Sequence, residues 1–209
     1  MIKLKQILEW SKNDPIPEIT RFDSGLGIIL LGPPGIGKTT FSKEYILSRN
    51  NKFKIVNPDD VSYVFTKDKT GKRWRDNSAN LAISYLSNIM KSKTNFIYDV
   101  TGTTIRRVTM VYNMAKDAGY TVILIHLLGE LDTALKQNKQ RERNVPEDIL
   151  IQYYKKSQSL ISKYSSELNP DNYYIILNLN NRYEFFKYEN GKLLGRKVDK
   201  YVEKENYND

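Results

Sequence analysis

Short apolar runs alternate along this chain with stretches in which apolar residues recur every three to four positions. The runs at residues 25–31, 53–56, 95–100, 121–127 and 173–177 have the length and composition of buried strands. The helical spacing predicts helices at about 39–48, 78–90, 105–118 and 131–140, and a further helix that begins near Pro146. Strands that alternate with helices in this way predict an α/β fold in which helices cover both faces of a parallel sheet.

The two ends of the chain depart from this alternation. Residues 1–24 have the pattern of a short amphipathic helix that is joined to the core through Pro15 and Pro17. Near the other end, two polar and aromatic runs flank Asn190-Gly191, a sequence typical of a type I′ hairpin turn. We therefore divide the chain into an N-terminal helical extension (1–24), a core domain (25–180) and a C-terminal β-hairpin with its tail (181–209). Residues 67–76, which are charged and lack an apolar period, predict a solvated loop.

Composition narrows the class of protein. The chain has 209 residues and is 40% apolar, enough for one sizeable core. It contains no cysteine, which excludes disulfides, thiolate metal sites and cysteine nucleophiles. No apolar run is long enough for a membrane span or a secretory signal, so we expect a cytoplasmic protein. The formal charge of +9 favours polyanionic partners, although excess charge also serves solubility.

The strongest chemical signal follows the first apolar run. Two glycines five positions apart, followed by Lys and Thr, match the Walker A pattern in Gly32-Pro33-Pro34-Gly35-Ile36-Gly37-Lys38-Thr39. Between a strand and a helix, the backbone N–H groups of this loop would point at phosphate oxygens. We expect the loop, together with Thr40, to bind ATP, with Lys38 at the β and γ phosphates and the Thr39 hydroxyl on Mg²⁺. The alternative is a glycine-rich turn that only links strand to helix.

A pair of carboxylates, Asp59-Asp60, follows the second predicted strand. Doubly wound sheets bind ligands at the carboxyl ends of their strands. A carboxylate there would align an attacking hydroxyl and accept its proton late in the transfer. The alternative role is to cap the helix that follows, and we expect one aspartate to cap while the other faces the substrate.

Two further groups of residues lie after later strands. Asp99 stands at the end of the third strand, where a Walker B acid would hold Mg²⁺ or where it would contact the substrate; the alternative is a cap for the helix that begins near Thr104. The basic segment from Lys136 to Arg143 joins two predicted helices. Arg141 and Arg143 would close over ATP and stabilise charge on the transferring phosphoryl group, unless this segment is only a solvated face.

Four motifs, taken together, resemble those of one kinase family. They are the Walker A loop with Thr40, then Asn57-x-Asp59-Asp60, then Asp99-x-Thr101 followed by Arg106-Arg107, and finally Arg141 through Val145-Pro146-x-Asp148-x-Leu150 with Tyr153. This series is similar to the kinase domain of bacteriophage polynucleotide 5′-kinases and covers about residues 26–165. The resemblance implies an adenylate-kinase-like P-loop kinase domain, with ATP as donor and a 5′-hydroxyl of DNA or RNA as acceptor. It also implies a general base at Asp59 and catalytic cations at Lys38 and Arg141. The substrate-binding residues it implies are Asp59, Asp60, Asp99, Thr101, Arg106 and Arg107.

The chain departs from that family at one position. Three residues after the catalytic aspartate, where the family has an arginine that grips the phosphate of the acceptor, this chain has Ser62. Lys67, Lys72, Arg73 or Arg75 of the following segment would have to replace it. The acceptor therefore stays open between a polynucleotide 5′-hydroxyl and a nucleoside, nucleotide, sugar nucleotide or hydroxymethylated base in DNA. A third hypothesis is an ATP-dependent binding protein that transfers no phosphate.

Two features are interpreted as structural. His126, the single histidine, lies within a strongly apolar run and is expected to be a hydrogen-bonded core residue. The hairpin near the C-terminus mixes aromatic with basic residues. We favour an added sheet edge whose aromatic side chains pack on the body of the protein, the alternative being a surface that stacks nucleic-acid bases.

Overall fold

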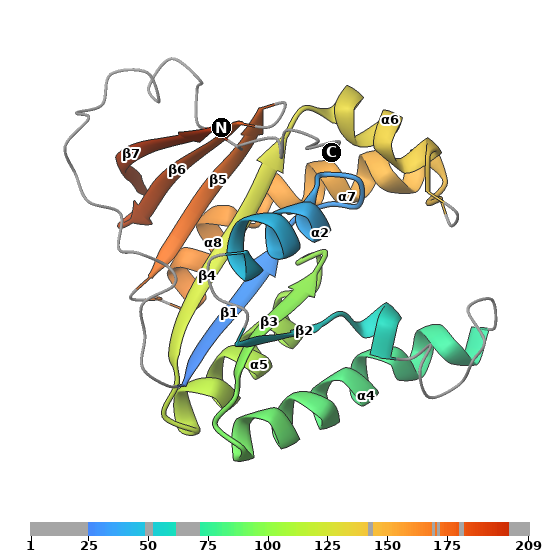
Figure 1. Ribbon diagram of the computed structural model, residues 1–209. Coiled ribbons are helices and arrows are strands. Elements are labelled where there is room, and N and C mark those ends of the chain that lie inside the picture. Colours follow the sequence, from blue (N-terminus) through green and yellow to red (C-terminus); the bar gives the residue numbers. More distant parts are fainter. Residues whose placement is uncertain are drawn as a thin grey trace, which may run out of the picture.

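The computed structural model describes residues 25–48, 52–61, 72–141, 144–168, 170, 172–179 and 182–200, with the backbone alone for 72–77 and 195–200. Five strands of its sheet run parallel: β1 (Leu26–Leu31), β2 (Phe53–Val56), β3 (Asn95–Val100), β4 (Thr121–Gly129) and β5 (Tyr173–Leu179). The antiparallel strands β6 (Arg182–Glu189) and β7 (Lys192–Lys200) extend it to the order β2-β3-β1-β4-β5-β6-β7 (Figure 1). The α/β prediction is confirmed. The predicted extension at 1–24 lies outside the described residues.

Helices cover both faces of this sheet (Figure 1). One apolar cluster joins the sheet to α4 (Lys72–Lys91), α5 (Ile105–Asp117) and α8 (Ile161–Leu168). A second cluster joins the other face to η1 (Phe41–Leu47), α6 (Leu131–Lys139) and α7 (Glu147–Ser159). The short helix α2 (Lys38–Thr40) leads directly into η1, which is wound as a π-helix. Among the described helices, none has both the length and the apolar character to cross a bilayer.

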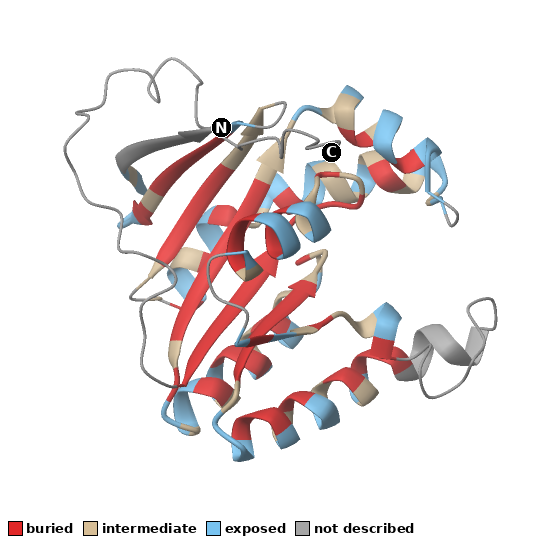
Figure 2. Ribbon diagram, viewed as in Figure 1, coloured by how far each residue is buried: buried red, intermediate tan, exposed pale blue. Residues whose placement is uncertain are grey.

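The central strands are mostly apolar, as expected for strands that are covered on both faces. Every residue of β1 is buried, and Ile29 contributes to one cluster while Ile28 contributes to the other. Figure 2 shows the same pattern, with the buried strands enclosed by helices that are exposed on their outer sides. Parallel pairing then brings the carboxyl ends of β1, β2 and β3 to one edge of the sheet. The loops that carry the predicted site residues start from this edge.

The prediction for residues 67–76 was wrong where the structure describes them. Helix α4 begins at Lys72, so Ser78, at the predicted start of the helix, is a buried residue inside it. Lys and Arg are good helix formers, and the helix is anchored further along by buried residues such as Ala82 and Leu86. Residues 67–71 lie outside the described part of the chain. Helix α8 was not predicted as a separate element.

The C-terminal hairpin continues the sheet and packs against the helix that follows the glycine-rich loop. Asn190 and Gly191 both have positive φ, 49° and 77°, as the predicted type I′ turn requires. Tyr183 of β6 meets Phe41 of η1 edge to face at 5.1 Å between ring centroids, and Phe185 lies 5.2 Å from Tyr45. The interpretation as an added sheet edge with packed aromatics is therefore confirmed. The hairpin supports the helix on which the glycine-rich loop ends.

Candidate active site

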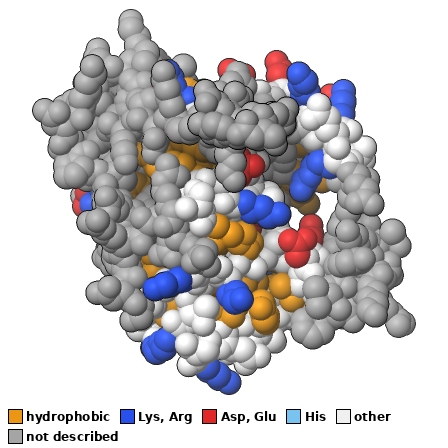
Figure 3. Space-filling view, in the orientation of Figure 1, with side chains coloured by type: hydrophobic (Ala, Val, Ile, Leu, Met, Phe, Trp, Pro, Cys, Tyr) orange, Lys and Arg blue, Asp and Glu red, His pale blue; other side chains and the backbone are white. Residues whose placement is uncertain are grey.

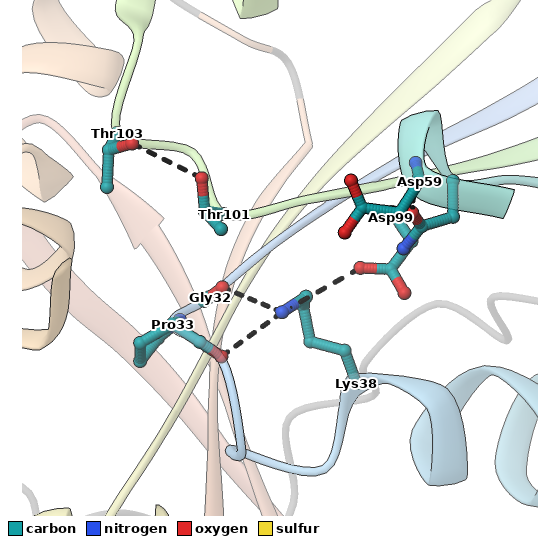
Figure 4. Close-up of polar contacts among 8 residues, drawn as sticks. Gly32, Pro33, Lys38, Asp59, Asp99, Thr101 and Thr103 are labelled. Carbon is teal, nitrogen blue, oxygen red and sulfur yellow. Dashed lines mark hydrogen bonds and ion pairs between the residues drawn. The ribbon is translucent and has the colours of Figure 1, made fainter. Parts of the chain in front are cut away.

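The glycine-rich loop leaves β1 and curls back so that its lysine points into the loop. The Lys38 Nζ atom donates hydrogen bonds to the carbonyl oxygens of Gly32 at 2.8 Å and Pro33 at 3.1 Å (Figure 4). Gly37, directly before the helix, has a left-handed φ of 90° that a larger residue would adopt only with strain. Thr39 and Thr40 follow and are exposed. The Walker A prediction therefore coincides with a folded loop at the start of a helix.

Neighbouring elements hold this loop closely on two sides. A Cβ atom added at Gly35, where φ is 75°, would lie 2.3 Å from the carbonyl oxygen of Ala134 in α6, so glycine alone fits there. On the other side, the Asn178 amide at the end of β5 donates a hydrogen bond to the Ile36 carbonyl oxygen at 3.0 Å. The loop is thus fixed by contacts from α6 and β5 as well as by its own turns.

A buried acid faces the loop lysine. The Asp99 Oδ1 atom lies 3.8 Å from Lys38 Nζ, and the two side chains are only 5% and 11% exposed. Burial raises the pKa of Asp99, while Lys38 and a hydrogen bond from Asn57 oppose that rise. Burial likewise lowers the pKa of Lys38, against the attraction of Asp99. Both charged groups are therefore held in a poorly solvated place at the end of the loop.

Asp59 and Asp60 lie in a helical turn, residues 58–61, directly after β2, and both are exposed. The cap of this turn is provided by Asn57, whose Oδ1 accepts the Asp59 N–H at 2.8 Å and whose carbonyl accepts the Val61 N–H at 3.0 Å. The expectation that one of the two aspartates caps the helix was therefore wrong, because both lie inside the turn. The charge of Asp59 acts on Lys38, and that of Asp60 acts on Asp99. The turn therefore lies beside the Lys38–Asp99 pair, as Figure 4 also shows for Asp59.

The segment after β3 carries three of the predicted substrate-binding residues, Thr101, Arg106 and Arg107. The N-cap of α5 is Thr104, so Asp99 does not cap that helix as its alternative interpretation required. The Thr101 and Thr103 hydroxyls are 3.2 Å apart. Arg106 and Arg107 are exposed in the first turn of α5. Burial raises the pKa of Tyr98 to about 12, and the nearby positive charge of Arg107 opposes this rise.

The basic segment after α6 reaches the same place. Arg141 is exposed, and its positive charge lowers the pKa of Lys38 and that of Asp99, so it lies near both groups. Its backbone N–H donates to the carbonyl oxygen of Asn138 at 3.2 Å, and Asn138 is 4% exposed. The Asn138 side chain donates to the Val145 carbonyl at 2.7 Å and accepts the Val145 N–H at 3.0 Å, which closes the base of the loop. Arg143 lies outside the described residues, as does Ser62.

The fit to Mg²⁺ can be tested on the polar atoms present. Asp99 Oδ1 is buried, and beyond the ion pair with Lys38 at 3.8 Å it has no hydrogen-bond partner, so this carboxylate oxygen suits a hard cation. The Thr39 hydroxyl is exposed at the start of the helix. Within the described part of the chain, no group of three or more His, Cys, Asp or Glu residues is placed to hold a metal by itself. This donor set fits a cation that takes its remaining ligands from phosphate and water, as Mg²⁺ does in P-loop proteins.

The structure brings together Lys38, Asp59, Asp99 and Arg141, which the sequence placed far apart. Figure 3 shows acidic and basic side chains around a hollow at the right of the view, between the part that holds α6 and the part that holds α4. His126 takes no part, because its ring is fully buried between Tyr173 and Ser157, to which its nitrogens hydrogen-bond. The prediction of a satisfied core histidine is confirmed.

Three asparagines that position the site were not predicted as functional. Asn57, Asn138 and Asn178 each hold backbone of a loop or turn at the site through a side-chain amide. Asn57 stood inside one of the recognised motifs, so its place was visible although its role was not. Asn138 and Asn178 belong to no spacing pattern, and only the fold shows which backbone groups they meet.

A buried parallel strand, a glycine-rich loop and a helix that starts at the loop lysine define a P-loop NTPase-type fold. A sequence-family model, AAA_33, described as an AAA domain, matches residues 28–159. This match covers more than half of the chain, and the protein belongs to this family. One curated relative is L-seryl-tRNA(Sec) kinase of Methanococcus maripaludis, 28% identical over 149 residues, which are 69% of this chain and 56% of the relative.

Several solved structures share the fold. The structure of the Pnkp1/Rnl/Hen1 RNA repair complex matches with a TM-score of 0.57 and 18% identity, over 68% of this chain and 47% of the other. The AvrRxo1-ORF1:AvrRxo1-ORF2 complex with ATP matches with a TM-score of 0.60 and 17% identity, over 80% and 59% of the two chains. The PezAT toxin-antitoxin system of Streptococcus pneumoniae matches with a TM-score of 0.60 and 12% identity, over 86% and 75%.

The comparisons show that the chain belongs to the AAA_33 family and that it is similar to a kinase over part of that kinase's length. The solved structures have such low identity to this chain that they show the fold alone. The chain spans 56% of the length of the curated relative and 47% of the Pnkp1-complex chain.

Proposed function

We propose that this protein is an ATP-dependent kinase that transfers the γ-phosphoryl group to a hydroxyl of a nucleic acid, with a polynucleotide 5′-hydroxyl as the leading acceptor. The observation that carries the proposal is the convergence of Lys38, Asp99, Asp59 and Arg141 at the end of the glycine-rich loop. This set contains a cation for the transferring phosphoryl group, a carboxylate for the hydroxyl and a second acid beside the loop. A turn that only linked a strand to a helix would need none of them.

The loop from Gly32 to Thr40 would bind the phosphates of ATP through its N–H groups and through Lys38. Lys38 now donates to loop carbonyls, which phosphate oxygens would replace as acceptors. Thr39 and Asp99 would hold Mg²⁺, and the ion, when bound, neutralises charge on the phosphates. An ATP complex of a protein with the same fold and the kinase relative support ATP as the donor.

In the transfer, the oxygen of the acceptor hydroxyl forms a bond to the γ-phosphorus while the bond from that phosphorus to the β,γ-bridging oxygen breaks. Asp59, exposed and beside Lys38, would orient the hydroxyl and take its proton as the new bond forms. Arg141, and Arg143 with it, would stabilise the charge on the phosphoryl oxygens. ADP leaves with its β-phosphate carrying the released charge.

A nucleic-acid acceptor is supported by charge and by the relatives. The chain has a formal charge of +9, and the exposed Arg106 and Arg107 lie at the first turn of α5, the helix that follows Asp99 and Thr101 in the chain. Cationic side chains bind a phosphate backbone and release its counterions. These arginines, with Asp60 and Thr101, would contact the acceptor. The names of two similar proteins include a tRNA and an RNA repair complex.

A second candidate acceptor is a hydroxyl carried on a tRNA in place of a strand end. It is favoured by the 28% identity to a kinase whose name specifies seryl-tRNA. The chemistry of attack by an alcohol oxygen is the same in both cases, so the residues of the site do not distinguish them. What differs is the part of the nucleic acid that the surface beside α5 would have to bind.

The test is to incubate the protein with γ-labelled ATP and separate acceptors: 5′-hydroxyl DNA, 5′-hydroxyl RNA, hydroxymethylated duplex DNA, seryl-tRNA, and a panel of nucleosides, nucleotides and sugar nucleotides. Label on a 5′-hydroxyl strand but not on its 5′-phosphorylated copy supports the leading proposal, and label on seryl-tRNA alone supports the second. Salt is a further criterion, since nucleic-acid binding must weaken steeply as salt rises. Label on a free metabolite alone, or ATP consumption without any labelled acceptor, would contradict both. Lys38→Ala, which lacks the lysine of the glycine-rich loop, is the negative control for phosphoryl transfer.

A further inference from the structure

Asn57 stands between the two carboxylates that the proposed reaction uses. Strand β2 ends at Val56, which pairs with Tyr98 of β3, so the next residues of the two strands, Asn57 and Asp99, are neighbours at the carboxyl edge of the sheet. Asn57 is also the residue from which the turn with Asp59 starts. One side chain is therefore within reach of both acids.

The two ends of the Asn57 amide are used differently. Its Oδ1 accepts the N–H of Asp59 at 2.8 Å. Asn57 is also the neighbour of Asp99 at the ends of β2 and β3, and its side-chain amide lowers the pKa of Asp99, as a donor facing the carboxylate does. A primary amide has both an acceptor and donors, so it alone among the short capping residues satisfies both partners at once. Asp would have no donor, and Ser would be too short to span them.

We infer that Asn57 is a positioning residue, which ties the turn carrying Asp59 to the buried Asp99 so that both acids keep a fixed place relative to Lys38. This inference rests on the proposed function, because it assigns Asn57 a task in the same transfer. In the turn that carries Asp59, residues 58–61, Asp59 and Asp60 are exposed and Val61 is buried, so the turn is anchored in the core at one end and by Asn57 at the other. A misplacement of about 1 Å at a reacting group is sufficient to cost about a hundredfold in rate.

If Asn57 only capped the turn, its substitutions would have different effects. Any side chain with an acceptor oxygen, such as Ser or Asp, would hold the turn if Asn57 did no more than cap it. Under the positioning role, Asn57→Ser retains a cap and still loses the link to Asp99. Asn57→Ser is therefore the informative variant, and Asn57→Ala, which loses both bonds, is its reference.

The kinetic test measures kcat, KM for ATP and melting temperature for Asn57→Ser and Asn57→Ala, each with Asp59 present and with Asp59→Ala. We expect both single variants to lower kcat by about 10- to 100-fold with KM for ATP changed by less than about threefold, and to have almost no further effect once Asp59 is absent. Wild-type kcat in Asn57→Ser, or an equal loss with and without Asp59, would overturn the inference. If wild-type protein phosphorylates no acceptor, the proposed function fails instead.

A second measurement does not depend on activity. If Asn57 links the turn to Asp99, then Asp99→Ala leaves the Asn57 amide without one anchor, and the Asp59 N–H should exchange with deuterium about tenfold faster or more. The Leu124 amide in the core of β4 is the control for global unfolding and should keep its exchange rate. Unchanged protection of the Asp59 N–H in Asp99→Ala would overturn the inference whether or not the acceptor is known.

Discussion

The buried His126 makes the stability of this fold depend on pH in a way that can be calculated. Its Nε2 lies 2.6 Å from the Ser157 hydroxyl and its Nδ1 lies 3.2 Å from the Tyr173 hydroxyl, with no exposed surface. Burial, and to a lesser extent the charge of Lys38, lower the pKa of His126 from 6.5 to about 3. The folded protein thus keeps this ring neutral at a pH where the unfolded chain protonates it.

The sign follows from proton binding. Above pH 6.5 neither state protonates the ring, and the free energy of unfolding does not depend on it. As the pH falls below 6.5 the unfolded chain binds a proton that the folded protein excludes, so stability is lost, by about 1.4 kcal/mol per pH unit down to about pH 3. The loss from His126 alone is about 2 kcal/mol at pH 5, and it approaches about 5 kcal/mol at the acid limit.

Urea unfolding at pH 7.5 and pH 5 measures this loss, with His126→Gln as the matched variant because glutamine has hydrogen-bonding groups but does not titrate. Wild-type protein should lose about 2 kcal/mol more than His126→Gln between the two pH values. The constant cost of the substitution cancels, since each protein is compared with itself. Parallel pH dependence in the two proteins would refute a neutral, buried His126.

Two further predictions concern the supports of the site. Gly35→Ala should weaken ATP binding by about tenfold or more, as measured by calorimetry, because its Cβ would lie 2.3 Å from the Ala134 carbonyl oxygen. Gly25 also has a positive φ, but an added Cβ would lie 3.6 Å from the nearest atom. Gly25→Ala is therefore the control and should cost only stability, about 1 kcal/mol. Asn138→Ala should lower kcat about tenfold or more because the loop after α6 loses both bonds that close it. The control is Asn95→Ala, which removes the buried hydrogen bond from the Leu26 N–H to Asn95 Oδ1 at the amino ends of β1 and β3, away from the site. It should lower the melting temperature and leave kcat unchanged. Equal effects of the site variants and their controls would contradict both predictions.

Much of the fold could be predicted because its signals are local. The bounds of β2 and β3 match the apolar runs, and the hairpin turn follows from the two residues at its tip, Asn190 and Gly191. The end of α5 was also predictable, since Gly119 takes the left-handed conformation, with φ of 79°, that stops a helix.

The parts that could not be predicted depend on tertiary contacts. The start of α4 at Lys72 has no apolar period to mark it, because the helix is anchored by buried residues several turns later. The π-helical winding of Phe41–Leu47 likewise cannot be predicted from the residues of this segment. Its stacked Phe41 and Tyr45 rings pack on β6, a strand that lies far along the sequence.

Part of the candidate site could also be predicted from the sequence, and part of it could not. The Walker A loop was predictable from its spacing, and parallel strands explain why Asp99 and the Asp59 turn come to one edge. The roles of Asn57, Asn138 and Asn178 could not be predicted, because an asparagine amide can bind many partners and the fold alone determines which backbone atoms it contacts. Short polar side chains of this kind hold the loops in place and leave no pattern in the sequence.

The most direct test of the central claim is single-turnover transfer from γ-labelled ATP by wild-type protein and by Asp59→Ala, with ATP affinity measured in parallel. If Asp59 aligns the acceptor hydroxyl at the γ-phosphate, the substitution lowers the transfer rate by about 10²- to 10⁴-fold and changes ATP affinity by less than about threefold. Asp117→Ala, at an exposed carboxylate near the end of α5, is the control and should match wild type in both. An unchanged transfer rate in Asp59→Ala would contradict the account.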